Sequence, residues 1–216
     1  MTTKPLSLIH LIRPSVSDEP APLILMLHGY GSDENDLFGF ADYLPEKYTI
    51  ISVRAPYKLQ PMGNAWYAIN FDANANKFSD TDQAIESRDR IKNFIHEAIE
   101  AYNINKNDIT LFGFSQGTIL SFATALTYPS LVKNIIGLSG YIDKNLIEMG
   151  DVNQIKNLNV FSSHGSVDQV IPVDWARKTP EILKEMNVNC TYKEFPVGHG
   201  VNQDNFQAVL EWLKKH

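Results

Sequence analysis

The sequence lacks features that mark several large classes of protein. Its 216 residues contain one cysteine, which excludes a disulfide within the chain. No apolar run approaches the roughly 20 residues of a membrane-spanning helix, so we expect no stable insertion into a membrane. The first residues lack the apolar core and cleavage site of a signal peptide. Together with the single cysteine, this predicts a cytoplasmic protein.

Positive charge is also scarce. The formal net charge is −6, which argues against nucleic acid as a partner. The chain shows no internal repeat and no low-complexity linker. Hydrophobic residues make up 44% and charged residues 20% of a chain whose length suits one domain, and we place that domain at residues 1–216.

Apolar runs and amphipathic segments alternate along the chain. Helical spacing predicts helices over 81–102 and 206–213, while Pro180 predicts a break within a third helix over 174–186, with Thr179 as the new cap. Strands are expected over 6–12, 22–27, 48–53, 109–112, 132–138, 160–163 and 190–195. This alternation implies an α/β fold with a mainly parallel sheet of about seven strands and helices on both faces.

The segment Gly113-Phe114-Ser115-Gln116-Gly117 stands between an expected strand and an expected helix. Gly-x-Ser-x-Gly in this context is the nucleophile elbow of the α/β-hydrolase fold. Side chains two residues before and after the serine would collide in so tight a turn, which explains both glycines. Ser115 is therefore the expected nucleophile, and its rival interpretation is a buried helix cap.

An acid and a histidine should follow the serine along the chain. Asp168 and His199 each come shortly after a strand, where open α/β sheets build their sites. His199 would take the proton of Ser115, and Asp168 would orient the imidazole. Other acids compete with Asp168, and we interpret them as residues that flank or cap helices: Asp143, Asp151 and Asp174.

The developing oxyanion needs two hydrogen-bond donors. The backbone N–H of Gln116, at the start of the helix, is one candidate. The second should come from the segment after the strand 22–27, from either Tyr30 or Gly31. His28 and His164 each precede a glycine at a strand end, and they either support neighbouring loops or touch the substrate.

Several segments resemble the phospholipase/carboxylesterase family, a group that includes bacterial carboxylesterases and acyl-protein thioesterases. The similar segments are 27–37, 65–67 with Phe71-Asp72, 113–117, 164–172 and 198–200, and the resemblance spans roughly residues 22–213. It implies a compact α/β-hydrolase that cleaves carboxylic esters, without a metal or organic cofactor. It also implies that Tyr30 rather than Gly31 supplies the second amide.

Aromatic residues cluster between residues 57 and 78, in a connection long enough to be functional. The resemblance makes Trp66 a candidate wall of the substrate pocket, and we add Met62 and Tyr141. The alternative is a loop folded over its own small core. Cys190 lies in the last strand without a histidine partner nearby, so we interpret it as structural.

The interval 139–157 holds roughly twenty residues, too few for a cap domain. We therefore expect an open cleft without interfacial activation, and a serine carboxylesterase that hydrolyses short- to medium-chain esters of small molecules through an acyl-enzyme. Thioesterase or lysophospholipase activity on the same triad is the alternative, followed by a non-catalytic ligand-binding homologue. The physiological substrate and the oligomeric state, including a homodimer, stay open.

Overall fold

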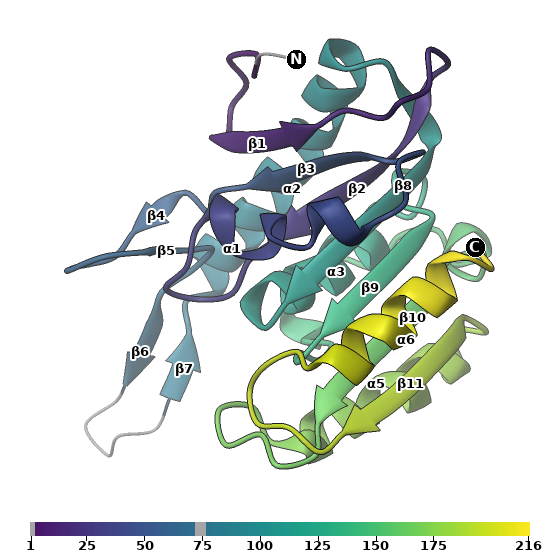
Figure 1. Ribbon diagram of the computed structural model, residues 1–216. Helices are drawn as coiled ribbons and strands as arrows, with labels where there is room; N and C mark the ends of the chain where they lie inside the picture. Colours follow the sequence, from purple (N-terminus) through teal and green to yellow (C-terminus); the bar gives the residue numbers. More distant parts are fainter. Residues whose placement is uncertain (1–2, 72–76) are drawn as a thin grey trace.

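The computed structural model describes residues 3–71 and 77–216. Its centre is a seven-stranded sheet with the strand order β1-β3-β2-β8-β9-β10-β11 (Figure 1). β1 runs antiparallel to β3, and the other neighbouring pairs are parallel. The strands are β1 His10–Arg13, β2 Ala21–Leu27, β3 Thr49–Val53, β8 Ile104–Phe114, β9 Asn134–Leu138, β10 Asn159–Gly165 and β11 Asn189–Phe195. This confirms the mainly parallel sheet expected from the sequence.

Helices cover both faces of the sheet (Figure 1). One face packs against α2 (Thr81–Ala101), α3 (Gln116–Thr127) and α5 (Val173–Glu185). The opposite face packs against α1 (Glu34–Phe38) and α6 (Gln203–Leu213). The shorter helical elements are η1 Ala41–Tyr43, η2 Lys144–Leu146 and α4 Val152–Ile155.

Strand β2 shows why the central strands are unbroken apolar runs in the sequence. Leu23, Leu25 and Leu27 belong to the core under α2 and α3, whereas Ile24 and Met26 belong to the core under α1 and α6. All five side chains are buried. Successive side chains of a strand point to opposite faces, so a strand covered on both faces is apolar at every position.

The expected break at Pro180 is wrong. α5 runs without interruption from Val173 to Glu185 with Pro180 inside it, and Pro172 rather than Thr179 is its N-cap. Ala176, Thr179 and Leu183 are buried on the same face of this helix. Packing of this face against the sheet spans the proline and offsets the one hydrogen bond that proline removes.

The first strand is shorter than its sequence pattern suggested. We expected it over residues 6–12, but β1 covers His10–Arg13, where it pairs with β3 at the edge of the sheet. Leu8 lies before the strand and is buried in the core, so its apolar character reflects packing rather than strand structure.

The aromatic segment after β3 forms two small hairpins. β4 (Tyr57–Lys58) pairs with β5 (Asn64–Ala65), and β6 (Ile69–Phe71) pairs with β7 (Lys77–Ser79). Figure 1 shows both hairpins extending beyond the sheet. Asp72, part of the similarity at 65–72, lies outside the described residues.

The connection between β9 and β10 contains the short elements η2 and α4 and no cap domain. Within the part of the chain that the structure describes, no helix has both the length and the apolar composition needed to cross a bilayer.

Candidate active site

Ser115 lies in a sharp turn between β8 and α3. Its backbone has φ 53° and ψ −116°, in the region that non-glycine residues avoid. Its N–H donates to the carbonyl oxygen of Leu138 at 2.9 Å, which ties the turn to the neighbouring strand. The strained conformation lifts the side chain out of the sheet, toward the cleft.

The two glycines of the motif are needed because of close backbone contacts. A Cβ atom at Gly113 would lie 2.6 Å from the backbone of Gly117. A Cβ atom at Gly117 would lie 1.9 Å from the carbonyl oxygen of Leu27. The elbow therefore packs directly against the end of β2, where the segment carrying Tyr30 begins.

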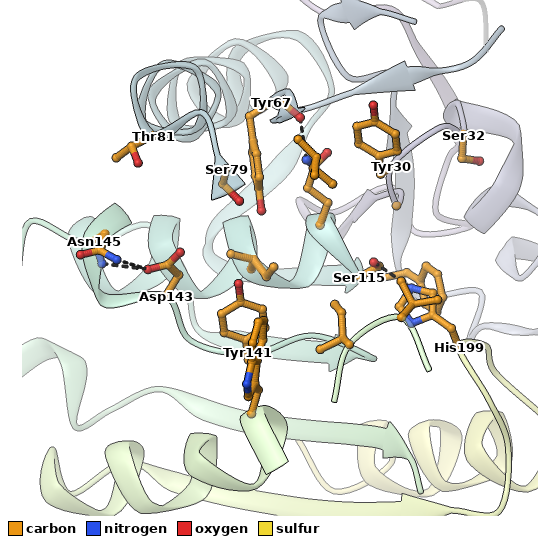
Figure 2. Close-up of a pocket in the computed structure, with 18 of the residues that line it drawn as sticks. Tyr30, Ser32, Tyr67, Ser79, Thr81, Ser115, Tyr141, Asp143, Asn145 and His199 are labelled. Atoms are coloured by element: carbon orange, nitrogen blue, oxygen red, sulfur yellow. Dashed lines mark hydrogen bonds between the residues drawn. The ribbon is translucent and has the colours of Figure 1, made fainter. Parts of the chain in front are cut away.

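The three residues predicted to form a triad meet at the carboxyl edge of the sheet. His199 Nε2 lies 2.9 Å from Ser115 Oγ, and His199 Nδ1 lies 2.7 Å from Asp168 Oδ2. His199 follows β11, and Asp168 follows β10. Figure 2 shows Ser115 and His199 together at one end of the cleft. This arrangement can pass a proton from the hydroxyl to the imidazole.

The Asp168 carboxylate is fixed by the loop that carries it. Oδ1 accepts hydrogen bonds from the backbone N–H groups of Val170 at 2.8 Å and Ile171 at 3.0 Å. Burial alone would raise the pKa of Asp168, but the hydrogen bonds from His199, Ile171 and Val170 outweigh it and hold the pKa below its ordinary value. The carboxylate is therefore ionised at neutral pH.

His164 supports the Asp168 loop. Its ring is fully buried at the end of β10, and its Nε2 lies 2.9 Å from the carbonyl oxygen of Ile171 and 3.2 Å from Asp168 Oδ2. A carbonyl oxygen can only accept, so Nε2 must carry the hydrogen. His164 does not line the cleft, which favours the supporting role left open by the sequence.

His28 holds a neighbouring loop in the same way. Its Nε2 accepts from the N–H of Ala55 at 3.0 Å, so Nδ1 carries the hydrogen and donates to the carbonyl oxygen of Gly29 at 2.7 Å. Burial lowers the pKa of His28 and outweighs the opposite effects of the Gly29 bond and nearby carboxylates. The ring is neutral and, like that of His164, is not part of the cleft wall.

The backbone of the Tyr30 segment distinguishes the two oxyanion candidates. The N–H of Gly31 donates to the carbonyl oxygen of Asn64 at 2.9 Å, so it is already engaged. Within residues 3–71 and 77–216, the N–H groups of Tyr30 and Gln116 have no backbone acceptor, and both residues line the cleft beside Ser115. The structure therefore leaves the amides of Tyr30 and Gln116 available to a ligand.

Trp66 is not a wall of the pocket, contrary to our expectation. Its side chain is fully buried in the core, and its Nε1 donates to the carbonyl oxygen of His28 at 2.9 Å. Gln116 fixes the same segment: Oε1 accepts from the N–H of Trp66 and Nε2 donates to the carbonyl oxygen of Tyr67, each at 2.8 Å. Trp66 thus anchors the segment to the elbow, and the adjacent Tyr67 lines the cleft.

The prediction for Met62 is also wrong. Met62 lies between β4 and β5 with 77% of its surface exposed, and it is not among the residues that line the cleft. The hairpin carries this side chain into solvent. Tyr141, in contrast, lines the cleft as expected.

The cleft has a volume of about 690 Å³ and extends well beyond Ser115. Its wall includes apolar and aromatic side chains, among them Ile119, Tyr141 and Trp175. The opposite end is polar: Figure 2 shows Ser79, Thr81, Asp143 and Asn145 at the side away from His199. Such a volume accommodates a small organic molecule.

The acids that competed with Asp168 have other partners. Asp143 caps η2, Asp151 caps α4, and Asp174 pairs with Arg177 at 2.8 Å in the first turn of α5.

Cys190 is partly buried, and burial raises the pKa of its thiol to about 12, which agrees with a structural role. Among the described residues, no group of three His, Cys, Asp or Glu side chains is placed to hold a metal ion.

Sequence reasoning missed several residues of the cleft wall. Tyr67 follows Trp66 directly in the similar segment 65–67, and this adjacency is the signal that could have pointed to it. Trp175 has 48% of its surface exposed on a helix whose outer face is otherwise charged, which was only a weak signal because single exposed hydrophobic residues are common. Ser79 and Thr81 carry no comparable signal.

Known proteins resemble this chain in sequence and in fold. A model of the phospholipase/carboxylesterase family matches residues 12–216. Acyl-protein thioesterase 1 of Yarrowia lipolytica is 30% identical over 158 residues, which cover 70% of this chain and 68% of that protein. Acyl-protein thioesterase 1 of Candida albicans is 25% identical over 219 residues, which cover 93% and 94% of the two chains.

Solved structures show the same fold. The Bacillus cereus carboxylesterase superposes with a TM-score of 0.84 at 20% identity, covering 97% of this chain and 94% of that one. Acyl-protein thioesterase 2 of Zea mays superposes with a TM-score of 0.77 at 19% identity, covering 96% and 98%. Because the family model spans nearly the whole sequence, the chain belongs to the phospholipase/carboxylesterase family of α/β-hydrolases and is a serine hydrolase of carboxylic ester bonds.

Proposed function

We propose that the protein is a carboxylesterase in which Ser115, His199 and Asp168 form the catalytic triad. The observation that carries this proposal is the continuous chain of hydrogen bonds from Ser115 Oγ through both nitrogens of His199 to Asp168 Oδ2. The ionised Asp168 keeps the hydrogen of the neutral imidazole on Nδ1. Nε2 is then free to accept a proton from the serine.

In the acylation step, Ser115 Oγ attacks the ester carbonyl carbon while its proton moves to His199 Nε2. The carbonyl oxygen becomes an oxyanion, which the N–H groups of Tyr30 and Gln116 stabilise. His199 then gives the proton to the alcohol oxygen, and the carbon–oxygen bond to the alcohol breaks. The product is an acyl group on Ser115 Oγ.

Deacylation repeats these steps with water as the nucleophile. His199 Nε2 takes a proton from water, whose oxygen attacks the acyl carbon, and the same two N–H groups hold the second oxyanion. His199 then returns the proton to Ser115 Oγ as the carboxylic acid leaves. Asp168 stays ionised and stabilises the imidazolium that forms twice in each cycle.

The cleft favours acyl groups of short to medium length. Ile119, one helical turn after Ser115, and Tyr141, which lies between Ser115 and Asp143 in Figure 2, offer apolar contacts along the cleft. Further from Ser115 the wall turns polar at Asp143 and Asn145, so a long apolar chain would meet a carboxylate that it cannot hydrogen-bond.

Thioester hydrolysis is a second candidate, favoured by the relatives named acyl-protein thioesterases. The same triad serves both reactions. A thiolate is a better leaving group than an alkoxide, so it depends less on protonation by His199. We therefore expect both activities to require Ser115.

The test is hydrolysis of p-nitrophenyl esters and matched thioesters of acetate to octanoate. Ser115→Ala should lower kcat/KM by a factor of about 10³ or more without changing the unfolding midpoint. Ser130→Ala is the control, because Ser130 is exposed and away from the cleft, and it should retain full activity. Turnover by folded Ser115→Ala near that of the unaltered protein would refute the proposal.

A further inference from the structure

The polar end of the cleft takes no part in the proposed chemistry. Asp143, the cap of η2, lies there beside Asn145, Ser79 and Thr81, at the side opposite His199 (Figure 2). Asp143 Oδ1 accepts from the backbone N–H and from Nδ2 of Asn145, each at 3.0 Å. Among the hydrogen bonds and ion pairs formed by residues 3–69 and 79–216, none involves Asp143 Oδ2.

The geometry of the reaction directs the acyl chain to this end. In the tetrahedral intermediate, the alcohol oxygen must lie near His199 Nε2, which protonates it. The oxyanion must face the N–H groups of Tyr30 and Gln116. The remaining substituent, the acyl chain, must then extend away from His199, and Asp143 lies on that side of Ser115 (Figure 2).

The charges along the cleft favour a cation and disfavour an anion. Asp36 and Asp143 line it, and among residues 3–69 and 79–216, whose side chains are described, no lysine or arginine forms part of its wall. Asp36 is exposed, and its carboxylate accepts from Ser32 Oγ at 2.9 Å. The formal net charge of −6 adds a weaker field of the same sign.

Aromatic side chains stand next to Asp143. The rings of Tyr141 and Trp175 meet edge to face, with centroids 5.2 Å apart, and Tyr67 lines the same part of the cleft. Burial and then the charge of Asp143 raise the pKa of Tyr141 to about 12, so its hydroxyl is neutral. Aromatic faces attract cations and also provide apolar contacts to a methylene chain.

Two lysines lie on the outer side of Asp143. Lys144 and Lys178 border a shallower hollow, which shares four lining residues with the main cleft: Tyr141, Asp143, Asn145 and Trp175. Both lysines are exposed, and neither lines the main cleft or forms an ion pair with Asp143 in the described chain. Water screens their charges, so they reduce the attraction of Asp143 for a cation without cancelling it.

We propose that the Asp143 end of the cleft binds a cationic group at the far end of the acyl chain of the substrate. This inference rests on the proposed function, because the acyl chain reaches Asp143 only if Ser115 is the nucleophile. A cation there gains the unengaged carboxylate oxygen and the aromatic rings, whereas a methyl group would desolvate the carboxylate without compensation.

The test compares p-nitrophenyl 6-(trimethylammonio)hexanoate with its neutral isostere, p-nitrophenyl 7,7-dimethyloctanoate, and with shorter and longer pairs of the same design. Each kcat/KM is divided by the rate constant for alkaline hydrolysis of the same ester, which corrects for differences in chemical reactivity among the esters. Asp143→Asn keeps the oxygen that caps η2. Asp151→Asn is the matched control, because Asp151 caps α4 in the same way and lies outside the cleft.

We expect the unaltered protein to prefer the best cationic ester over its isostere by at least tenfold, mainly through KM. Asp143→Asn should reduce this ratio below threefold and raise the rate on the isostere, whereas Asp151→Asn should keep the ratio. Calorimetric binding of both esters to Ser115→Ala should show the same preference without turnover.

Three results would overturn the inference: a preference for the neutral isostere, an equal rate on both esters, or a ratio unaffected by Asp143→Asn. In each of these cases hydrolysis of the neutral ester continues, so the proposed function would stand. If neither ester is hydrolysed and Ser115→Ala binds both equally, the proposed function and the inference fail together.

Discussion

The two ends of the cleft are built by different interactions. At the Ser115 end, hydrogen bonds fix each reacting group: Asp168 is held by two backbone N–H groups, and His199 is held between Asp168 and Ser115. At the Asp143 end, polar side chains stand beside aromatic rings, and the Asp143 carboxylate keeps one oxygen that accepts no hydrogen bond from residues 3–69 and 79–216. Fixed hydrogen bonds suit chemistry that needs one geometry, whereas aromatic walls suit binding that tolerates several ligands.

The largest effect should follow from breaking the hydrogen bonds at the Ser115 end. Asp168→Asn keeps an oxygen for the N–H groups of Val170 and Ile171, but its amide cannot orient a neutral His199 with the hydrogen on Nδ1. We expect kcat to fall by a factor of about 10³ to 10⁴ while the protein stays folded. Ester hydrolysis and circular dichroism of the same samples measure both effects.

Asp174→Asn is the matched control for this change. Asp174 is exposed and pairs with Arg177, and it competed with Asp168 in the sequence. The Asp174→Asn variant should retain more than half of the activity of the unaltered protein. Loss of activity in Asp174→Asn together with normal turnover by Asp168→Asn would reverse the assignment of the acid.

Two tryptophans, Trp66 in the core and Trp175 in the cleft wall, should contribute differently to the stability of the fold. Trp66→Ala should lower the free energy of unfolding by about 3 to 5 kcal/mol, because it removes a fully buried ring and its hydrogen bond to His28. Trp175→Ala should lower it by about 1 kcal/mol or less, because Trp175 is 48% exposed. Urea unfolding measures the difference, and equal losses would contradict the distinction.

The smallest effect concerns the pH dependence of stability at the Ser115 end. The folded-state pKa of Asp168 lies below its unfolded value of about 3.9. The ionised carboxylate therefore stabilises the fold above that unfolded value, and the contribution is lost as pH falls through the folded-state pKa. The gap in unfolding free energy between the unaltered protein and Asp168→Asn should narrow from pH 6 to pH 3. A gap that widens over this range would show that folding raises the pKa of Asp168.

The residues of the Ser115 end could be predicted because short sequence patterns mark them. Gly113 and Gly117 are dictated by contacts within one turn, and Asp168 and His199 each follow a strand whose apolar run is visible. The residues alone left Tyr30 and Gly31 open, and only the family resemblance favoured Tyr30. The structure adds that the Gly31 N–H is engaged by Asn64, on a hairpin that the sequence did not predict.

The Asp143 end could not be predicted because its parts come from distant segments. Whether Trp66 or Tyr67 faces the cleft depends on hydrogen bonds to His28 and to Gln116, 38 and 50 residues away from Trp66 in the sequence.

The continuity of helix α5 could not be predicted either, because packing against the sheet rather than local helix propensity decided the outcome at Pro180. The extent of a single domain over residues 1–216 stays a prediction.

The most direct test of the account is to identify the residue that becomes acylated. The protein is mixed with a p-nitrophenyl ester, quenched in acid during the first turnover, digested and analysed by mass spectrometry. We predict a mass increase equal to the acyl group on the peptide that contains Ser115, and no increase in Ser115→Ala. An acyl group on another residue, or rapid turnover with no burst of p-nitrophenol and no acylated peptide, would contradict the account.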